Sequence, residues 1–245
     1  MNTIAECRGV SFSYGRHPVL SDISFCLSPG ITGLLGVNGA GKSTLIRLLA
    51  TLRRPSSGSV EVAGQDVTAR AGSIEARRYL GYLPQSFEVM NFSTVEANVE
   101  YAAWAHGVDE QNVRAVTLET LKAVGLDELA KRRVRTLSGG QRQRLGIACA
   151  TAHKPELLLL DEPTVGVDPL QRDALRGMIA ELGKSSAILL STHLVEDVAR
   201  LADRVLIMDC GRLVFDGSVD DLVAKVPTAV DRTVAIETAF RMMAS

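Results

Sequence analysis

The segment GVNGAGKST, from Gly36 to Thr44, combines glycines, a lysine and two hydroxyl side chains at a spacing that suits phosphate binding. It follows an apolar stretch typical of a strand and precedes a stretch with helical spacing. Lys42 adds a charge near terminal phosphates, and Ser43 can ligate magnesium. A dinucleotide-binding pattern fails, because Thr44 stands where its third glycine should be. The expected phosphate-loop residues are Gly36, Asn38, Gly39, Ala40, Gly41, Lys42, Ser43 and Thr44.

Four polar side chains lie where predicted strands end. Asp161 and Glu162 follow the apolar run LLLL, Gln85 follows YLGYLP, and His193 follows the strand-like segment AILLS. In open parallel sheets, ligands bind at the carboxyl ends of the strands. We therefore expect all four side chains on the same sheet edge as the phosphate loop.

These side chains suit the attack of water on a terminal phosphate. Asp161 suits a direct or indirect contact to magnesium, and Glu162 suits a general base, held out of the helical region by Pro163. Gln85 can contact magnesium or the attacking water, or be an ordinary loop amide. His193 can contact the γ-phosphate, or simply stand at a helix start. The expected catalytic residues are Glu162, His193 and Gln85, and the expected magnesium ligands are Ser43, Gln85 and Asp161.

A second anion site is indicated far from the first. In LSGGQ, residues 137–141, Ser138 and two glycines precede a helical stretch, and free N–H groups at a helix start attract anions. The alternative is a plain helix cap with a flexible Gly-Gly pair. One γ-phosphate has little use for two cradles on one molecule, so the second makes sense if it serves another copy packed head to tail. Tyr14, at the end of a predicted strand, can stack on a purine or simply cover the sheet.

The pattern of elements must position these groups. Alternating apolar residues predict two N-terminal strands, one with Val10 and Phe12 and the next with Ile23 and Phe25 on one face. GITGLLG is typical of a buried strand, and KSTLIRLLATLRR has helical spacing. SGSVEVAGQDV indicates a hairpin or edge strand, and RRYLGYLPQ another strand ended by a proline.

The middle of the chain, from Ser93 to about His153, is helical in pattern. Ser93 and Glu96 are spaced as a capping box for a first helix. A second helix is expected over about 109–124, and a third from LSGGQ onward. This block is expected to be a helical lobe inserted into the α/β core.

Alternation of strands and helices then resumes. ELLLLDEP, SAILLSTH, RVLIMD and RLVFDG predict strands, with helices at PLQRDALRGMIAEL and LVEDVARLAD. This alternation predicts an α/β fold with a parallel sheet. We expect one domain over residues 1–220, with its α/β core at about 1–90 and 154–218 and its helical part at about 91–153. A short amphipathic tail is expected over 219–245.

The bulk composition excludes several classes of protein. The 245 residues carry a net charge of −1 and only 4% aromatic residues, which argues against general nucleic-acid binding. The apolar runs fall short of the roughly 18 residues needed to span a bilayer. The N-terminus does not have the pattern of a signal peptide. The four scattered cysteines are expected to be reduced, and they form no metal-ligand pattern with the histidines.

Together these motifs resemble the nucleotide-binding subunit of an ATP-binding cassette (ABC) transporter. The resemblance rests on the phosphate loop, Gln85, LSGGQ, LLLLDEP, VGVD at 165–168 and His193, in the order and spacing of that family over roughly 4–217. LSGGQ is highly specific to it. Val167 stands where the family usually has leucine. The resemblance implies a P-loop NTPase fold with a RecA-like, mostly parallel sheet, an N-terminal antiparallel β subdomain and an inserted helical subdomain.

The resemblance also implies the ligands, partners and location. ATP and Mg²⁺ would bind a head-to-tail dimer of two copies, or of this chain and a paralogue. LSGGQ of one copy would meet the γ-phosphate held by Lys42 of the other. The groove near Gln85 and the helical lobe would receive a helix of a polytopic membrane subunit, which places the chain at the cytoplasmic face of the membrane. The residues added to the nucleotide site are Tyr14, Ser138, Gly139, Gly140, Gln141 and Asp168.

Within this family, PTVGVDP, YLPQ and STVEANVEYAAWAHGV resemble exporters with separate membrane subunits. An importer subunit is the first alternative. A soluble cassette ATPase of DNA repair or translation is the second. It is disfavoured because only 53 positions separate Gln85 from Ser138, with no coiled coil, and because the chain holds one cassette. A GTPase or kinase would leave LSGGQ unexplained, and no NKxD-type motif is present.

Overall fold

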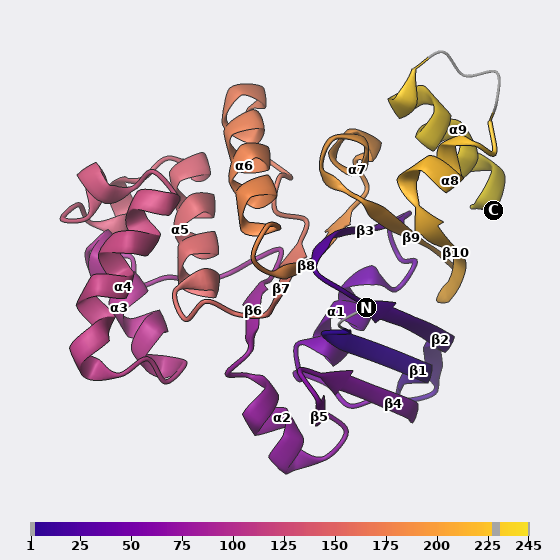
Figure 1. Cartoon of the computed structure of the whole chain (residues 1–245), viewed down its shortest axis with the longest axis horizontal. Helices are drawn as coiled ribbons and strands as arrows, with labels where there is room; N and C mark the ends of the chain where they lie inside the picture. The colour runs from indigo at the N-terminus through magenta and orange to yellow at the C-terminus, as the bar shows by residue number, and fades with distance from the viewer. Residues whose placement is uncertain (1–2, 227–230, 245) are drawn as a thin grey trace.

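The computed structural model describes residues 3–226 and 231–244, which form two sheets and a set of helices (Figure 1). The larger sheet has six strands in the order β10-β9-β3-β8-β7-β6. All pairs are parallel except β9–β10. Its strands are β3 (Gly30–Gly36), β6 (Leu80–Leu83), β7 (Leu157–Asp161), β8 (Ala187–Thr192), β9 (Arg204–Asp209) and β10 (Arg212–Ser218).

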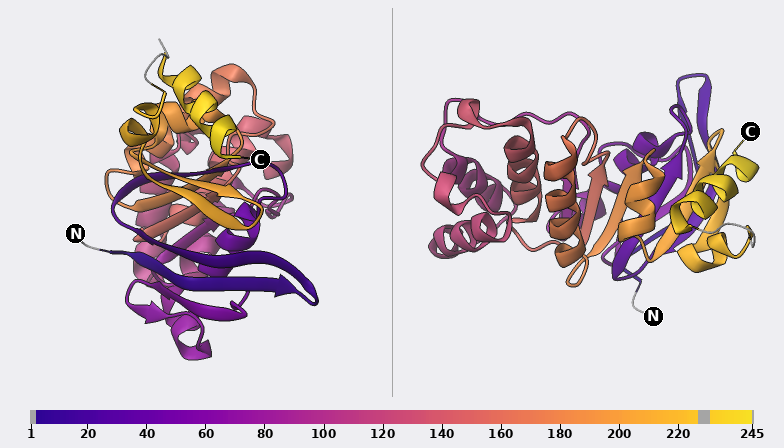
Figure 2. Two further views of the ribbon diagram at one scale, coloured as in Figure 1. Left: turned by 90° about the vertical axis from the view of Figure 1, so that its right-hand side faces the viewer. Right: turned by 90° about the horizontal axis from the view of Figure 1, so that it is seen from above.

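The central strands of this sheet are apolar because both faces are covered. Every residue of β7 and β8 is buried, as expected for strands packed between two layers. On one face lie α1 (Lys42–Leu49) and the smaller sheet. On the other lie α6 (Pro169–Leu182) and α7 (Val195–Leu201). Figure 2 shows this layered arrangement, with the helical lobe at one end.

The smaller sheet is antiparallel, in the order β2-β1-β4-β5. The predicted alternation is confirmed, since Val10, Phe12, Ile23 and Phe25 are all buried. Tyr14, at the end of β1, is exposed. The strands are β1 (Ala5–Tyr14), β2 (His17–Leu27), β4 (Ser57–Val62) and β5 (Gln65–Asp66).

The inserted lobe has a hydrophobic core of its own. It consists of α3 (Val95–Ala105), α4 (Glu110–Ala123), two 3₁₀ turns and α5 (Gly139–Thr151). Val99, Leu121 and Leu145 bring one fully buried side chain from each helix into this core. Figure 1 shows the lobe at the opposite end of the molecule from the small sheet.

Two local expectations were wrong, and one helix was missed. The cap of α3 is Thr94, whose Oγ1 accepts a hydrogen bond from the Ala97 N–H, so Ser93 and Glu96 do not form a capping box. Helix α1 ends at Leu49 because Thr51 turns into the left-handed region at φ 59°, which leaves Leu52 exposed. A further helix, α2 (Arg70–Ala76), was not predicted, because its short, mostly polar sequence has no apolar period.

The C-terminal segment packs against the core. It contains α8 (Val219–Val223) and α9 (Arg232–Met243), and the buried Ile236 belongs to the same apolar cluster as Leu175 and Val198. Residues 227–230 and 245 of the expected tail lie outside the described residues.

Candidate functional site

The phosphate loop joins β3 to α1 and needs its glycines. Gly41 has a φ of 101°, and a Cβ there would come within 2.8 Å of the Leu20 side chain. A Cβ on Gly36 would come within 2.7 Å of the Met208 carbonyl oxygen. Only glycine therefore allows the loop to curl this close to its neighbours. The loop forms one wall of a pocket of about 320 Å³, which Gln85 and Glu162 also line.

Lys42 is buried in this pocket and surrounded by oxygen atoms. Its Nζ donates hydrogen bonds to the carbonyl oxygens of Gly36 at 2.7 Å and Val37 at 3.3 Å. Glu162 Oε1 lies 3.8 Å away. Burial lowers the pKa of Lys42, and the carboxylates of Glu162 and Asp161 partly oppose this. These contacts hold the lysine ammonium group beside the loop, within reach of a phosphate bound there.

Asp161 and Ser43 meet across the first turn of α1. Ser43 Oγ donates to Asp161 Oδ1 at 3.2 Å, and Ser191 Oγ donates to the same oxygen at 2.5 Å. Asp161 is almost fully buried. A hydroxyl and a carboxylate are the hard oxygen ligands that Mg²⁺ prefers, so these residues fit that ion.

Glu162 and His193 form a close pair beside the lysine. His193 Nδ1 lies 2.7 Å from Glu162 Oε2, and Glu162 is buried while His193 is half-exposed. The backbone of Glu162 has a φ of 56°. The residue therefore lies outside the right-handed helical region, as expected before Pro163, but in the left-handed region instead of the extended one. Its N–H donates to the Ser191 carbonyl oxygen and hydroxyl.

The sheet edge thus brings Lys42, Ser43, Asp161, Glu162 and His193 together, and Gln85 lines the same pocket. Ser191 was not predicted as a residue of this site. The one signal for it was a hydroxyl residue at the end of a strand predicted to lie near Asp161.

Tyr14 lies at the rim of this region. Its ring contacts Phe12 edge-on at 4.8 Å, and the Arg53 guanidinium lies 5.8 Å from its centroid. Burial raises its pKa, but interactions with the side chains of Thr44 and Arg47 outweigh this and lower it. The exposed ring therefore neighbours the end of the phosphate loop.

The LSGGQ segment lies elsewhere on the molecule. Ser138 caps α5 and shares a capping box with Gln141, in which each side chain accepts the other's backbone N–H. Gly139 is exposed, with open space where a Cβ would be, and Gly140 packs against Gln171. None of these residues is among the described residues that line the phosphate pocket. Asp168 is exposed and caps α6 by accepting the Gln171 N–H at 3.1 Å.

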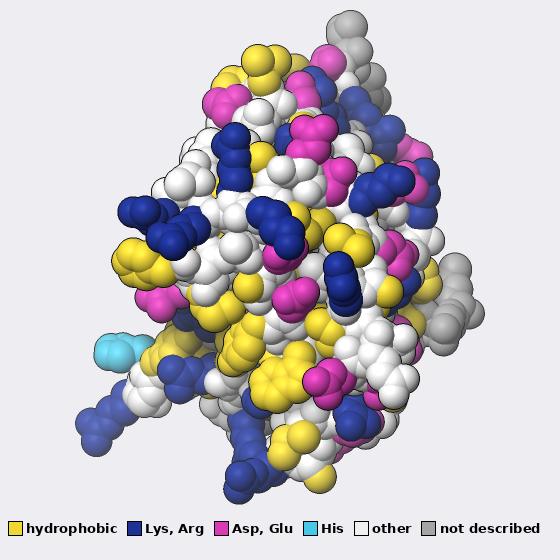
Figure 3. All heavy atoms as spheres, turned by 90° about the vertical axis from the view of Figure 1, so that its left-hand side faces the viewer, with side chains coloured by type: hydrophobic (Ala, Val, Ile, Leu, Met, Phe, Trp, Pro, Cys, Tyr) yellow, Lys and Arg dark blue, Asp and Glu magenta, His cyan; other side chains and the backbone are white. Residues whose placement is uncertain are grey.

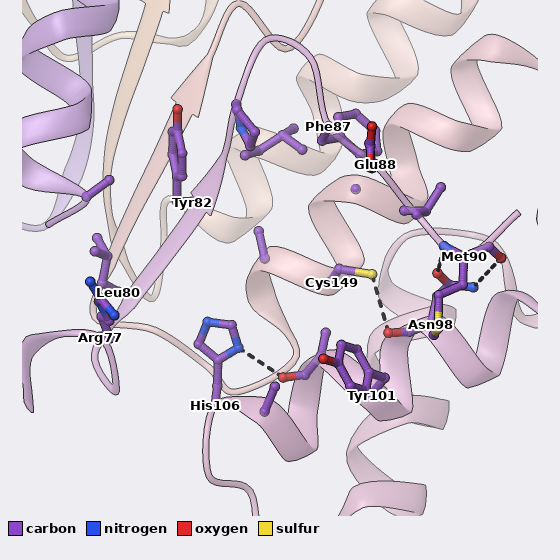
Figure 4. Close-up of a pocket in the computed structure, with 18 of the residues that line it drawn as sticks. Arg77, Leu80, Tyr82, Phe87, Glu88, Met90, Asn98, Tyr101, His106 and Cys149 are labelled. Carbon is purple, nitrogen blue, oxygen red and sulfur yellow. Dashed lines mark hydrogen bonds between the residues drawn. The ribbon is translucent and has the colours of Figure 1, made fainter. Parts of the chain in front are cut away.

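A second, larger pocket of about 840 Å³ lies between the helical lobe and the sheet (Figure 4). Its lining includes Tyr82 and Phe87 from the β6 side and Met90, Tyr101 and His106 from the lobe. Figure 3 looks onto this end of the molecule and shows hydrophobic side chains gathered there. The exposed large apolar residues of the lobe, and of the segment that leads into α3, are Met90, Phe92, Tyr101, Trp104 and Leu118.

Across the described ranges, no helix combines the length and apolar character needed to cross a bilayer.

The chain is similar in sequence and in fold to several known proteins. Residues 20–165 match the model of the protein family described as ABC transporter. The methionine import ATP-binding protein MetN of Caulobacter vibrioides is 41% identical over 217 residues, which are 86% of this chain and 65% of that protein. The linearmycin resistance ATP-binding protein LnrL of Bacillus subtilis is 33% identical over 223 residues, 90% of this chain and 71% of LnrL.

A solved structure of the ATP-binding subunit of an ABC transporter superposes with a TM-score of 0.85 at 29% identity, covering 98% of this chain and 100% of that one. This similarity confirms the α/β fold class expected from the sequence.

Proposed function

Because the chain belongs to the ABC transporter family and is an ATPase domain of that type, we propose that it hydrolyses ATP to power transport through a membrane subunit. The observation that carries this proposal is the grouping of Lys42, Glu162 and His193 around the phosphate loop. A cation that holds the phosphates, a base and a hydrogen-bonding partner for that base are the parts that phosphoryl transfer to water needs.

In this mechanism the loop N–H groups and Lys42 hold the β- and γ-phosphates. Glu162 orients a water and takes its proton as the water oxygen bonds to the γ-phosphorus and the bond to the β–γ bridging oxygen breaks. The products are ADP and inorganic phosphate. His193 holds the Glu162 carboxylate and contacts the γ-phosphate. Ser43, Asp161 and Gln85 would hold Mg²⁺, which when bound neutralises charge on the phosphate oxygens.

Two copies would complete the site. The exposed start of α5 and the open space at Gly139 leave the helix N-terminus accessible to an anion carried by a second molecule. The surface around Asp168 is also exposed, with Val165 and Leu170 presenting apolar side chains. A head-to-tail dimer would bury these features around ATP, and loss of the γ-phosphate would release them.

The large pocket of Figure 4 is the proposed seat of a helix from a polytopic membrane subunit. Its apolar lining suits the apolar face of a helix. It lies beside Gln85 and the helical lobe, so a bound helix would sense movement of either. Such a contact would hold the chain at the cytoplasmic face of the membrane.

We further propose export as the direction, on the segments PTVGVDP and YLPQ and on the similarity to LnrL, whose name records linearmycin resistance. The similarity to a methionine import protein favours import as the second candidate. In sealed vesicles with this chain outside, an exporter complex moves cargo inward, away from the ATPase. Linearmycin and methionine are the probes, and ATP-dependent exit of preloaded methionine would reverse the proposed direction.

ATP hydrolysis itself is tested with the purified chain. Phosphate release that requires ATP and Mg²⁺ and saturates with ATP is the expected result. A pure, folded chain that neither binds ATP nor releases phosphate would refute the proposal.

A further inference from the structure

Glu162 and His193 form the proposed hydrolytic pair. A buried carboxylate, that of Asp197, lies near this pair without belonging to it. Asp197, in the first turn of α7, has no exposed surface. Its Oδ2 accepts a 2.5 Å hydrogen bond from the Thr164 hydroxyl, and the Thr192 hydroxyl lies 3.4 Å from the same oxygen. Both threonines are also fully buried.

The other oxygen of Asp197 is bound by an arginine from α6. Arg176 Nε donates to Asp197 Oδ1 at 2.7 Å, and Nη2 lies 2.6 Å from the same atom. Arg176 also contacts Asp173 and Glu196, which keeps the guanidinium in place. A charge removed from water is strongly unfavourable unless it is paired and hydrogen-bonded, so this carboxylate fixes the groups around it.

The two threonines place this cluster next to the chemistry. Thr164 lies two residues after Glu162, and Thr192 lies immediately before His193. Glu162 has a left-handed backbone, which is unfavourable for a residue other than glycine and persists only where surrounding contacts hold it. The Val165 N–H closes a turn on the Glu162 carbonyl oxygen at 3.3 Å, so Thr164 is part of the turn that sets this conformation.

We propose that Asp197 is a positioning residue that ties the Thr164 turn to Thr192 and thereby sets the geometry of the Glu162–His193 pair. The proposal rests on the proposed ATP hydrolysis. Asp197 is fully buried and is not among the described residues that line the phosphate pocket. It acts by joining two backbone segments, separated by 28 positions, that carry the base and its partner.

A purely structural ion pair would behave differently from a positioning residue. Breaking it would lower stability and leave the turnover of the folded molecules unchanged. If Asp197 is a positioning residue, its loss would loosen the Glu162–His193 pair by about an ångström. This would lower kcat, because the base must align with the attacking water, and would leave ATP affinity unchanged. The separation of kcat from ATP affinity therefore distinguishes the two roles.

The first test is Asp197→Asn, which keeps the size of the side chain but removes its charge and one acceptor. We expect kcat for ATP hydrolysis to fall by about tenfold or more, with ATP affinity unchanged within about twofold. A kcat within twofold of the wild type in folded protein would overturn the proposal.

A matched pair at Thr164 keeps the test valid if the Asp197 variant does not fold. Thr164→Val has the same shape without the hydroxyl, whereas Thr164→Ser keeps the hydroxyl. We expect kcat to fall by about fivefold or more for valine and to stay within about twofold for serine. Equal kcat values for the two variants would contradict the proposal.

Asp216→Asn is the control for losing an arginine partner elsewhere. Asp216 on β10 accepts two short hydrogen bonds from Arg204, and among the described residues its side chain contacts neither Glu162 nor His193. We expect its thermal midpoint to drop and its kcat to stay at the wild-type value. If wild-type protein itself releases no phosphate, the proposed function fails. If the wild type is active and the Asp197 and Thr164 variants match it, only the positioning role fails.

Discussion

Glu162 combines a strained backbone, burial and a close histidine. Its carboxylate lies between a lysine and His193, and its N–H is held by Ser191 on the neighbouring strand. These contacts fix the carboxylate in one orientation, which a proton acceptor needs and a solvated surface glutamate lacks. The proposed role as general base therefore requires the Glu162 carboxylate itself, in this fixed orientation.

Replacing Glu162 with glutamine should stop hydrolysis and spare binding. The amide keeps the shape of the side chain but cannot accept the proton of water, so we expect kcat to fall by about 100-fold or more. ATP affinity, measured by calorimetry, should stay within about threefold of the wild type. Near-normal phosphate release by this variant would remove Glu162 from the mechanism.

The sequence predicted which residues would gather at the sheet edge but not how they are held. Asp161, Glu162 and His193 could be placed because parallel strands end on one side. The left-handed backbone of Glu162 could not, because it depends on contacts with Ser191, 29 residues away. Asp197 was not predicted as a site residue either, because its contacts with Thr164 and Arg176 also join distant parts of the sequence. The catalytic and ligand roles of these residues stay predictions.

At the scale of single elements, the start of α3 illustrates how a cap is chosen. Ser93 and Thr94 are both capping residue types, and the spacing to Glu96 favoured Ser93. In the structure Thr94 caps the helix, because residues 93 and 94 are held against the 3₁₀ turn through Val134 N–H to Ser93 O and a bridge from Thr94 to Arg133. A tertiary contact thus decided between two locally similar choices.

The cap can be checked by a matched pair of alanine variants. Thr94→Ala removes the hydrogen bond to the Ala97 N–H, and we expect a loss of about 1 kcal/mol in the free energy of unfolding. Ser93→Ala should cost less than about 0.5 kcal/mol, because no side-chain cap is lost. Urea unfolding measures both. The reverse order would place the cap at Ser93.

The end of α3 is joined to the core by two stacked histidines. The rings of His106 and His153 are 4.1 Å apart and nearly parallel. His106 Nδ1 contacts the Ala102 carbonyl oxygen, and His153 Nε2 contacts that of Leu80 on β6. Burial, and then repulsion from His106, lowers the pKa of His153 to about 4, against a smaller opposing effect of the hydrogen bond to Leu80.

This shift predicts a loss of stability in mild acid. Above about pH 6.5 His153 is neutral in both states and has no effect. As pH falls from 6.5 to 4, the unfolded chain takes up the proton and the folded chain does not, so stability decreases. After allowance for partial exposure the decrease is about 2 kcal/mol. His153→Gln should flatten the pH dependence of urea unfolding over this range, and an unchanged slope would contradict the assignment.

Most helices and strands were predictable because their apolar periods are strong. The apolar residues of β7, β8 and α6 predicted the bounds of these three elements to within a few residues. The failures were at short or weakly patterned segments. The seven residues of α2 bury only Ser73 and Ala76, which leaves no period to detect. The end of α1 depends on a left-handed turn at Thr51 that apolar spacing does not encode.

At the scale of the whole molecule, the phosphate loop and the LSGGQ helix start belong to different parts of the chain. Lys42 lies on the α/β core and Ser138 on the helical lobe, and the two do not share a pocket in the described structure. If each nucleotide contacts both, the contacts come from two copies. A pairing with two-fold symmetry, in which Lys42 of each copy faces Ser138 of the other, would then give two equivalent sites.

Mixing two inactive variants tests this arrangement directly. Lys42→Ala damages the loop side of a site, and Ser138→Arg fills the space at the helix start. Each variant alone has two defective sites per dimer. In a mixed dimer one site carries both defects, and the other combines the intact Lys42 of one copy with the intact Ser138 of its partner. An equal mixture should therefore recover about one quarter of wild-type phosphate release per chain.

The control is Lys42→Ala mixed with Glu162→Gln, whose defects lie on the same side of the site, so every site stays defective and activity should not return. Recovery in the first mixture and not in the second identifies sites shared between copies, whereas no recovery in either mixture would place each site within a single chain.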